Sequence, residues 1–354
     1  MTENDTVTFV DGRASAGDSF AFRDRSGWIA LFGWIQIAMA ALVLLSIPLA
    51  FVNPQWTRQA LGSPTGDLGG SAPATTGGDA PVKAMGPAIV SSGFNLLTAA
   101  FFAWTGIGTL KVSRWARTLV LSAAKLWLLT GIVAMVYWLW TAPALGTMLA
   151  STSGVEVPPA IVGLLIAIVT LVVTFLYVVL PSAFVLFFRS AAVRLTFERL
   201  DPVPSFTESV PAPVLSLTLT LALLSATALV FAPLGVIGVF GIVWTGAAAV
   251  ISWLAVAVLI AYLTRAYWRL QPVGWWGTLI ATLLATAAAV TTIAQVDLSM
   301  LLLAAGFPEE QIEALQWMGL TSRPALQTLT LLSAGLVLVS LFRTFRFFRG
   351  RPTV

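Results

Sequence analysis

The sequence contains no cysteine and no histidine, and these two absences exclude several kinds of chemistry. Without cysteine the chain has no disulfide, no thiolate nucleophile and no thiolate ligands for an iron–sulfur cluster. Without histidine it has no imidazole for zinc or haem binding, general base catalysis or pH sensing. Ser–His and Cys–His catalysis are therefore excluded, and we expect no cofactor and no metal site.

Charged residues are also scarce, at 10% of the 354 residues, while 58% are hydrophobic. Soluble domains carry about 25% charged residues. The long hydrophobic stretches contain one acidic residue, Asp297, which lies at the end of a stretch. A catalytic pair of carboxylates, or an acidic site for ion coupling, is thus missing from them. No G-x-x-x-x-G-K-[ST] loop indicates an ATPase, and we expect a protein that is not an enzyme.

Eight hydrophobic stretches are long enough to cross a membrane, for which about 20 apolar residues suffice. They predict an all-α fold, a polytopic membrane helix bundle. We expect eight transmembrane helices, at residues 28–51, 87–110, 117–140, 159–188, 213–231, 236–264, 273–296 and 325–342.

Prolines and glycines predict where two of these stretches are interrupted. Pro181 has no backbone N–H and should kink the fourth span. As one helix, residues 214–263 would be roughly 75 Å long, far more than the thickness of a bilayer. Pro233, Gly235 and Gly238 should therefore end the fifth span and let the chain turn back.

The basic residues predict the orientation of the chain in the membrane. With eight spans, nearly all arginines and lysines outside the spans fall on one side, including Arg114, Arg194 and Arg269. That side faces the cytoplasm under the positive-inside rule, so we expect both termini to be cytoplasmic and the protein to lie in a bacterial inner membrane. The basic excess is then a topology signal, and we expect no nucleic acid partner.

The spans divide the chain into five segments and suggest two similar halves. The segments are a cytoplasmic tail (1–26), a first four-helix half (27–200) with a flexible outer loop (52–86), a cytoplasmic linker (201–212), a second four-helix half (213–343) and a basic cytoplasmic tail (344–354). At an offset of 160 residues, "WARTL" at 115–119 matches "WWGTL" at 275–279, and "LFFR" at 186–189 matches "RFFR" at 346–349. These matches predict two halves in parallel orientation. Because they are few and of low complexity, a chance origin stays open.

One lysine lies inside a span. Lys125 is eight residues beyond Arg117, which corresponds to about 12 Å along a helix. Its long side chain should reach back to the headgroups, as lysines near helix ends do. The alternative is a cation that faces the bundle and binds an anionic substrate or lipid. Candidate contacts with anionic lipid headgroups are Lys125, Arg114, Arg117, Arg343, Arg346 and Arg349.

Two spans carry small residues at a spacing of four, a pattern that lets helices approach closely. In the second span the pattern includes Ser91 and Asn95. In the seventh span the small and hydroxyl residues are Gly277, Thr278, Ala281, Thr282, Ala285 and Thr286. We expect close helix packing, with hydroxyl groups that bond across the contact. The alternative is a narrow polar path lined by the same residues.

Residues 308–318 have the pattern of a short amphipathic helix. Pro308 suits a first helical position, Glu309 and Glu310 suit the positive end of the helix dipole, and Ile312 begins an apolar face. Such a helix is too short to cross a bilayer. We expect it to lie along the outer membrane surface, on the side opposite the arginines.

Two functions stay open on this pattern. The first is a non-catalytic scaffold, assembly factor or membrane component that binds lipid or protein. Its partners would be membrane lipids, with anionic headgroups on the cytoplasmic side, and other membrane proteins. The second is a transporter or channel for a small neutral or amphipathic solute, without an ATPase of its own and without an acidic coupling site inside the membrane.

Overall fold

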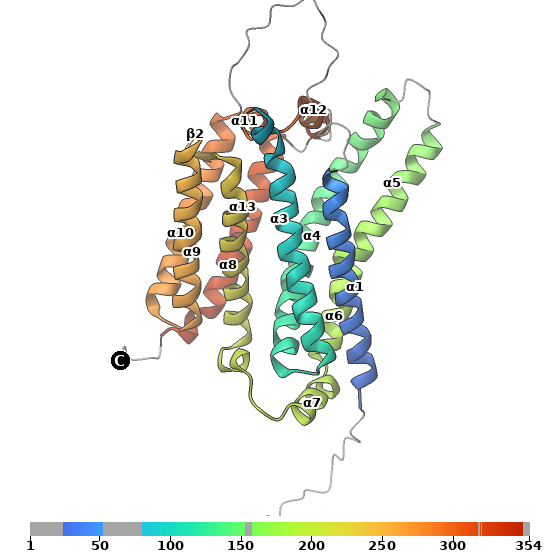
Figure 1. Ribbon diagram of the computed structural model, residues 1–354, viewed down its shortest axis with the longest axis vertical. Coiled ribbons are helices and arrows are strands. Elements are labelled where there is room, and N and C mark those ends of the chain that lie inside the picture. The colour runs from blue at the N-terminus through green and yellow to red at the C-terminus, as the bar shows by residue number, and fades with distance from the viewer. Residues whose placement is uncertain (1–23, 52–79, 153–157, 318, 320, 350–354) are drawn as a thin grey trace, which may run out of the picture.

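The computed structural model describes residues 24–51, 80–152, 158–317, 319 and 321–349, most of which are helical. Within this part of the chain, eight helical segments are long and apolar enough to cross a membrane. The prediction of a membrane helix bundle with eight spans is therefore confirmed, and the protein is a multi-pass membrane protein. Figure 1 shows the spans side by side, with short elements at both ends of the bundle.

The first four spans use three long helices and one interrupted helix. Helix α3 starts seven residues earlier than the predicted span, inside the predicted outer loop 52–86, whose residues 52–79 lie outside the described chain. The elements are α1 (Ser26–Phe51), α3 (Ala80–Leu110), α4 (Arg114–Thr152), α5 (Pro159–Thr174), the π-helix η1 (Phe175–Val179), α6 (Leu180–Arg189) and the short helix α7 (Ala191–Leu200).

The second four spans are joined by shorter elements. In chain order these are η2 (Phe206–Ser209), α8 (Ala212–Phe231), η3 (Ala232–Leu234), β1 (Val236–Val239), β2 (Ile242–Thr245), α9 (Ala247–Trp268), α10 (Pro272–Gln295), α11 (Leu298–Ala304), α12 (Glu309–Trp317), α13 (Arg323–Thr344) and η4 (Phe345–Phe347).

The fourth span is distorted where Pro181 predicts it. Pro181 has no N–H to donate to the carbonyl of Tyr177, four residues earlier, and the π-helix η1 occupies this part of the span. The freed carbonyl of Tyr177 lies against Gly131 of α4, since a Cβ at Gly131 would be 2.1 Å from that oxygen. A glycine is thus required for α4 and the distorted turn to approach each other.

The sixth span begins later than predicted. Residues 236–245, assigned above to the start of a helix, form an antiparallel β-hairpin in which Val239 pairs with Ile242. Phe240 and Gly241 both have positive φ (51° and 80°), as a two-residue hairpin turn requires. The prediction failed here because an apolar run rich in valine and isoleucine suits a strand as well as a buried helix. Gly235, with φ of 61°, ends η3 as expected.

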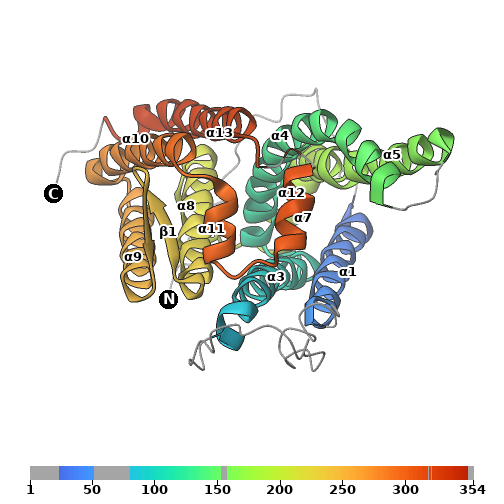
Figure 2. The same cartoon turned by 90° about the horizontal axis from the view of Figure 1, so that it is seen from above.

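The bundle consists of two groups of four spans, each with its own core. Figure 2 shows α1, α3, α4 and α5 on one side and α8, α9, α10 and α13 on the other. Buried Phe184, Phe188 and Phe197 belong to the first core, and buried Tyr267 and Phe348 to the second. Phe188 and Phe348 are the aligned residues of the "LFFR" and "RFFR" sequences, and each lies in the core of its own half.

The same tight turn joins the second and third spans of each half. In the first half Val112 has φ of 50°, its N–H bonds to the Thr109 carbonyl, and the Ser113 N–H bonds to the Gly108 carbonyl. In the second half Leu270 has φ of 56°, and the N–H groups of Leu270 and Gln271 bond to the carbonyls of Tyr267 and Ala266. The pattern is identical. Aligning Val112 with Leu270 makes the offset between the two halves two residues shorter than the offset of 160 that the sequence matches predict.

Beside each turn, a glycine allows the two helices to approach closely. In the first half this glycine is on the helix before the turn, and in the second half it is on the helix after the turn. In the first half the glycine is Gly108 on α3, where a Cβ would lie 2.8 Å from the Cβ of Ala116. In the second half it is Gly274 on α10, where a Cβ would lie 2.6 Å from the carbonyl carbon of Ala266. The alignment pairs Gly108 with Ala266 and Ala116 with Gly274, so the glycine and alanine have exchanged places.

The basic tail predicted at 344–354 is part of the fold as far as Phe348. Thr344 is fully buried and bonds to the hydroxyl of Tyr267. Phe348 packs in the core of the second half. The aromatic residues of this segment, rather than its arginines, decide its place, because burial of a phenylalanine side chain stabilises a fold by about 1.5–3 kcal/mol.

Helix α12 confirms the predicted short helix over residues 309–317; Met318 lies outside the described chain. It lies across one end of the bundle (Figure 2), opposite the end that holds α7 (Figure 1). Ile312 is buried, and the side-chain amide of Gln316 donates to the hydroxyl of Ser299 in α11 at 2.7 Å. The helix therefore covers the bundle and is tied to its neighbour.

Candidate functional site

Basic residues gather at the end of the bundle that holds α7, called the basic end below. They lie on the helix ends and connections at that end: Arg25, Lys111, Arg114, Arg117, Arg189, Arg194, Arg199, Arg265, Arg269, Arg343, Arg346 and Arg349. At the α12 end, the charged residues whose side chains the structure describes are one basic residue, Arg323, and three acidic residues: Asp297, Glu309 and Glu313. The two ends of the bundle thus differ in charge.

Arg114 is engaged within the protein, which corrects its assignment as a headgroup contact. Its Nε and Nη2 lie 3.0 Å from the two carboxylate oxygens of Glu208, and Nη1 donates to the carbonyl of Pro202. Its backbone N–H donates to Asp201. Arg114, Asp201 and Glu208 form a clamp, called the linker clamp, which holds the segment between the two halves against α4.

Arg117 and Lys125 lie close to other cations. The Nε of Arg117 is buried and has no hydrogen-bond partner among the described residues. The side chain of Lys125 is exposed, and the charged groups near it are Arg189 and Arg117. An exposed lysine among arginines favours the snorkelling interpretation over a cation that faces the bundle.

The three arginines near the C-terminus remain exposed although the chain around them is packed. The guanidinium of Arg346 lies 4.8 Å from the ring centre of Phe347, and that of Arg349 lies 4.7 Å from the ring centre of Phe345. Arg343 lies in the last turn of α13 and is also exposed. Stacking on an aromatic ring holds a guanidinium in place without neutralising its charge, so these residues stay candidate headgroup contacts.

A groove at the basic end was missed by sequence reasoning. It has a volume of about 440 Å³, lies between α8 and α9, and is lined by Thr218, Ala261, Thr264, Arg265, Trp268 and Arg269. Arg265 and Arg269 are four residues apart on one helix face, and this spacing was the available signal. From the sequence both arginines are interpreted only as topology markers, because nothing local shows that α8 leaves space beside them.

The small residues of α3 are used in packing, with one exception. The amide of Asn95 donates to the hydroxyl of Ser46 in α1 at 3.1 Å, and Ala99 is buried. Asn95 thus takes part in a contact between α3 and α1. Ser91 is exposed, so its assignment to a packed ridge is wrong.

Among the predicted small residues of α10, Gly277 makes a close contact with a neighbouring helix. A Cβ at Gly277 would lie 2.4 Å from Leu263 of α9. The hydroxyls predicted to bond across the contact donate instead to carbonyls four residues earlier in α10, at 2.7–2.8 Å, in Thr278, Thr282 and Thr286. Ala281 is half-buried and Ala285 is exposed, so the predicted ridge does not continue along the helix. A threonine hydroxyl satisfied within its own helix gains little from a partner across the contact.

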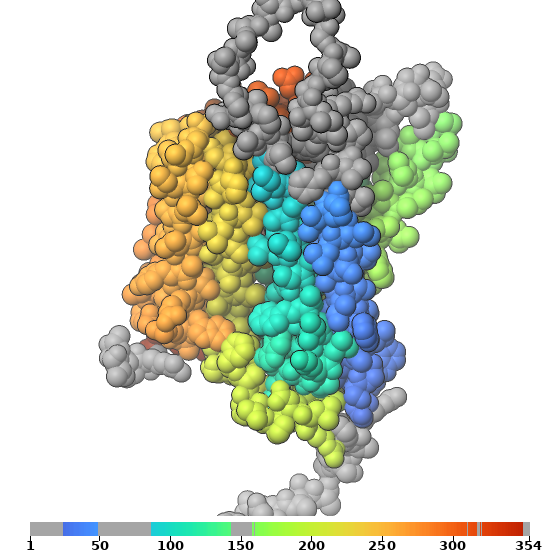
Figure 3. Space-filling model, viewed as in Figure 1, coloured from blue at the N-terminus to red at the C-terminus, as the bar shows by residue number. Residues whose placement is uncertain are grey.

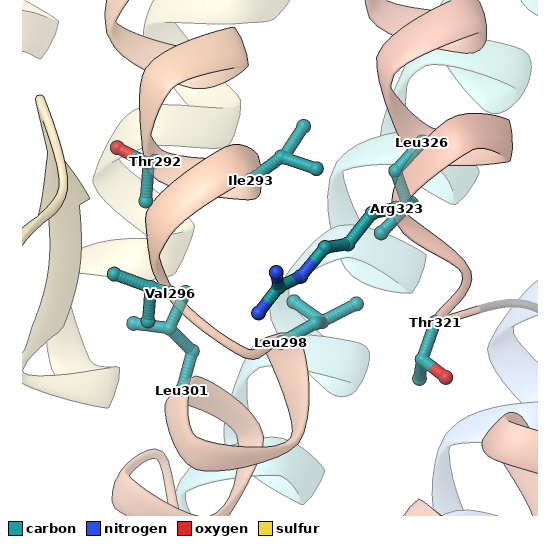
Figure 4. A pocket seen from close by; sticks show the side chains of 8 residues that line it. All are labelled: Thr292, Ile293, Val296, Leu298, Leu301, Thr321, Arg323 and Leu326. Atoms are coloured by element: carbon teal, nitrogen blue, oxygen red, sulfur yellow. The ribbon is translucent and has the colours of Figure 1, made fainter.

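A second cavity, near the α12 end, is far smaller. Its volume of about 20 Å³ has room for roughly one water molecule. Thr292, Ile293 and Leu298 are among its lining residues, and Arg323 points toward them (Figure 4). Nearby Asp297 accepts a hydrogen bond from the Ser299 N–H at 3.0 Å. That bond, together with the Ser299 hydroxyl and the charge of Arg323, lowers the pKa of Asp297.

No protein-family model, curated protein or solved structure matches the chain. In the part of the chain that the structure describes, no three acidic side chains come together as ligands for a metal ion. The basic end, with its groove, is the region whose geometry supports a binding function.

Proposed function

We propose that the protein is a non-catalytic component of a bacterial inner membrane, which binds anionic lipid headgroups and other membrane proteins at the surface of a packed bundle. Its basic end and both termini face the cytoplasm in this proposal. The uneven distribution of charge between the two ends supports that orientation, because basic residues are retained on the cytoplasmic side.

The observation that carries the proposal is the use of small residues in helix contacts. Gly33 and Gly106 bring α1 and α3 together, since a Cβ at Gly33 would lie 2.8 Å from Leu110 and a Cβ at Gly106 would lie 2.9 Å from Ile37. Gly277 serves the same purpose between α9 and α10. Among the residues that a polar path would need, Gly277 is thus in contact with a neighbouring helix, and Asn95 bonds to Ser46 of α1.

The contact between the two halves supports the same proposal. Helix α8 packs against α3 and α4 of the first half, and Figure 3 shows the surfaces of α8 and α3 side by side on the face in view. The two cavities described above lie at the ends of the second half and not between the halves. Direct packing of one half against the other suits a scaffold, whereas a transporter places its substrate site between its repeats.

The proposal is tested with the full chain extracted from native membranes and, separately, reconstituted in liposomes. Chemical cross-linking before extraction should recover the same membrane proteins at a constant ratio to the chain, compared with an unrelated eight-span protein as the control. Liposomes that contain the chain should swell in small neutral solutes no faster than empty liposomes. Solute-dependent swelling, without a constant protein partner, would instead support the transporter or channel.

A further inference from the structure

The groove between α8 and α9 offers two cationic groups and few other donors. The hydroxyl of Thr218 donates to the Val214 carbonyl at 2.8 Å, and that of Thr264 donates to the Ile260 carbonyl at 2.7 Å. Both hydroxyl hydrogens are therefore engaged. The donors that remain for a ligand are the indole N–H of Trp268 and the guanidinium groups of Arg265 and Arg269. The guanidinium groups match the geometry of a phosphate group.

The positive charge of the groove is not compensated within the described chain. Neither Arg265 nor Arg269 makes an ion pair there, since the carboxylates of the basic end are engaged with other residues. Glu208 pairs with Arg114, and Glu198 pairs with Arg194 at 2.7 Å. Two exposed guanidinium groups one helical turn apart attract an anion more strongly than either would alone.

The surroundings of the arginines match the shape of a lipid. On the face of α9 that carries Arg265, the residues farther from the basic end are apolar and exposed on the bundle surface: Leu254, Val258 and Ala261. At the level of the arginines, Trp268 packs against the exposed ring of Phe206, with ring centres 6.1 Å apart. Tryptophan at a helix end is typical of the headgroup level of a membrane. The face thus combines an anion-binding end with an apolar path for an acyl chain.

The corresponding position of the first half is filled. Alignment of the two turns places Gly106 opposite Thr264, and exposed Ile107 opposite Arg265. A Cβ at Gly106 would meet Ile37 at 2.9 Å and Gln36 at 3.2 Å, so α1 occupies the space that stays open beside α9. The groove is therefore a property of these side chains and not a consequence of the repeated fold.

We propose that the groove binds one anionic phospholipid, with its phosphate between Arg265 and Arg269 and an acyl chain along Val258 and Leu254. This inference rests on the proposed function, because it names a ligand of the basic end and the residues that hold it. It does not depend on which proteins accompany the chain.

The experiment uses the purified full chain in a mild detergent, with lipid binding measured by native mass spectrometry and by the shift in thermal unfolding. Phosphatidylglycerol and phosphatidylcholine with the same acyl chains are compared. The double variant Arg265→Gln/Arg269→Gln should bind phosphatidylglycerol about 30-fold more weakly, since each basic residue near an anionic lipid contributes about a factor of five. Lys111→Gln/Arg189→Gln, which removes the same charge from exposed basic residues of the same end, is the matched control and should retain binding.

A second variant tests the groove without changing its charge. Ala261→Phe fills the apolar path and should weaken phosphatidylglycerol binding while it leaves thermal unfolding without lipid unchanged, because Ala261 is exposed. Equal losses in the control and in the Arg265/Arg269 variant would overturn the site, as would full binding by Ala261→Phe. If inorganic phosphate raises the midpoint of thermal unfolding as much as phosphatidylglycerol does, the groove binds a free anion and not a lipid. The cross-linking and liposome-swelling experiments do not depend on lipid binding by Arg265 and Arg269. A failure of this lipid site would therefore not contradict the proposed function.

Discussion

The two halves share a turn but pack their first two spans differently. In the first half, Gly33 and Gly106 bring α1 and α3 together, and the buried amide of Gln36 donates to the hydroxyl of Thr109 at 3.4 Å. In the second half, α8 and α9 meet through a hydrogen bond from Ser225 to the Ala257 carbonyl, and a groove lies between them at the basic end. The same topology therefore gives a closed surface in one half and an open groove in the other.

The fourth spans differ in the same way. In the first half the span is interrupted by η1, and Figure 1 shows α5 inclined away from the other helices. In the second half α13 is uninterrupted and packs against α10. One proline accounts for the difference, because Pro181 removes a helix hydrogen bond that α13 keeps. The two halves thus share the geometry of one turn, but they differ in where a proline removes a backbone N–H and in where glycines allow close packing.

The largest effect is expected at the interrupted span. Gly131→Ala would place a Cβ 2.1 Å from the Tyr177 carbonyl oxygen, and overpacking of this kind costs about 1–3 kcal/mol or more. The midpoint of thermal unfolding in detergent should fall clearly. Gly163→Ala in α5 is the control, because a Cβ there meets nothing within 4 Å. A Gly131→Ala protein as stable as the control would mean that α4 and η1 are not in close contact.

The shared turn is tested by exchanging its glycine. Gly274→Ala should destabilise the second half by about 1–3 kcal/mol, since the new Cβ would lie 2.5 Å from the Tyr267 backbone nitrogen. Adding Ala266→Gly reproduces the arrangement of Gly108 and Ala116 and should restore part of the loss, again measured by thermal unfolding. If the losses of stability caused by the two substitutions are additive, the two turns are not equivalent.

A smaller effect is expected at the linker clamp between the halves. Glu208→Gln removes the charge that pairs with Arg114, whose side chain is 15% exposed, and we expect a loss of about 1 kcal/mol. Glu198→Gln breaks a more exposed pair within α7, which contributes about 0.3–0.5 kcal/mol. Chemical unfolding of the two variants should rank them in this order. The reverse order would show that the linker is held by other contacts.

The smallest effect is expected for the lysine inside the third span. Alignment of the turns places exposed Leu283 opposite Lys125, so Lys125→Leu makes the first half resemble the second. We expect a change within about 0.5 kcal/mol, as for other surface substitutions. A collapse in thermal stability of the detergent-extracted variant would show that Lys125 is part of a buried charge network.

The fold was predictable where local properties decide it. The lengths of the apolar stretches determine eight spans, because a bilayer has a fixed thickness. Gly235 ends a helix at positive φ, Pro181 distorts one, and the glutamates at 309 and 310 begin α12. Each of these depends on neighbours within a few residues. The sequence itself is sufficient for them.

Tertiary structure decided what residues far apart in the chain do to one another. Arg114 is a structural residue because Glu208, 94 positions away, reaches it. Residues 236–245 form a hairpin whose turn is held by Thr292, which accepts the Gly241 N–H at 3.1 Å. Arg265 and Arg269 line a groove because α8 leaves space beside α9. Hydropathy measures the preference of one segment for the membrane, and it carries no information about which side chains meet when the segments pack.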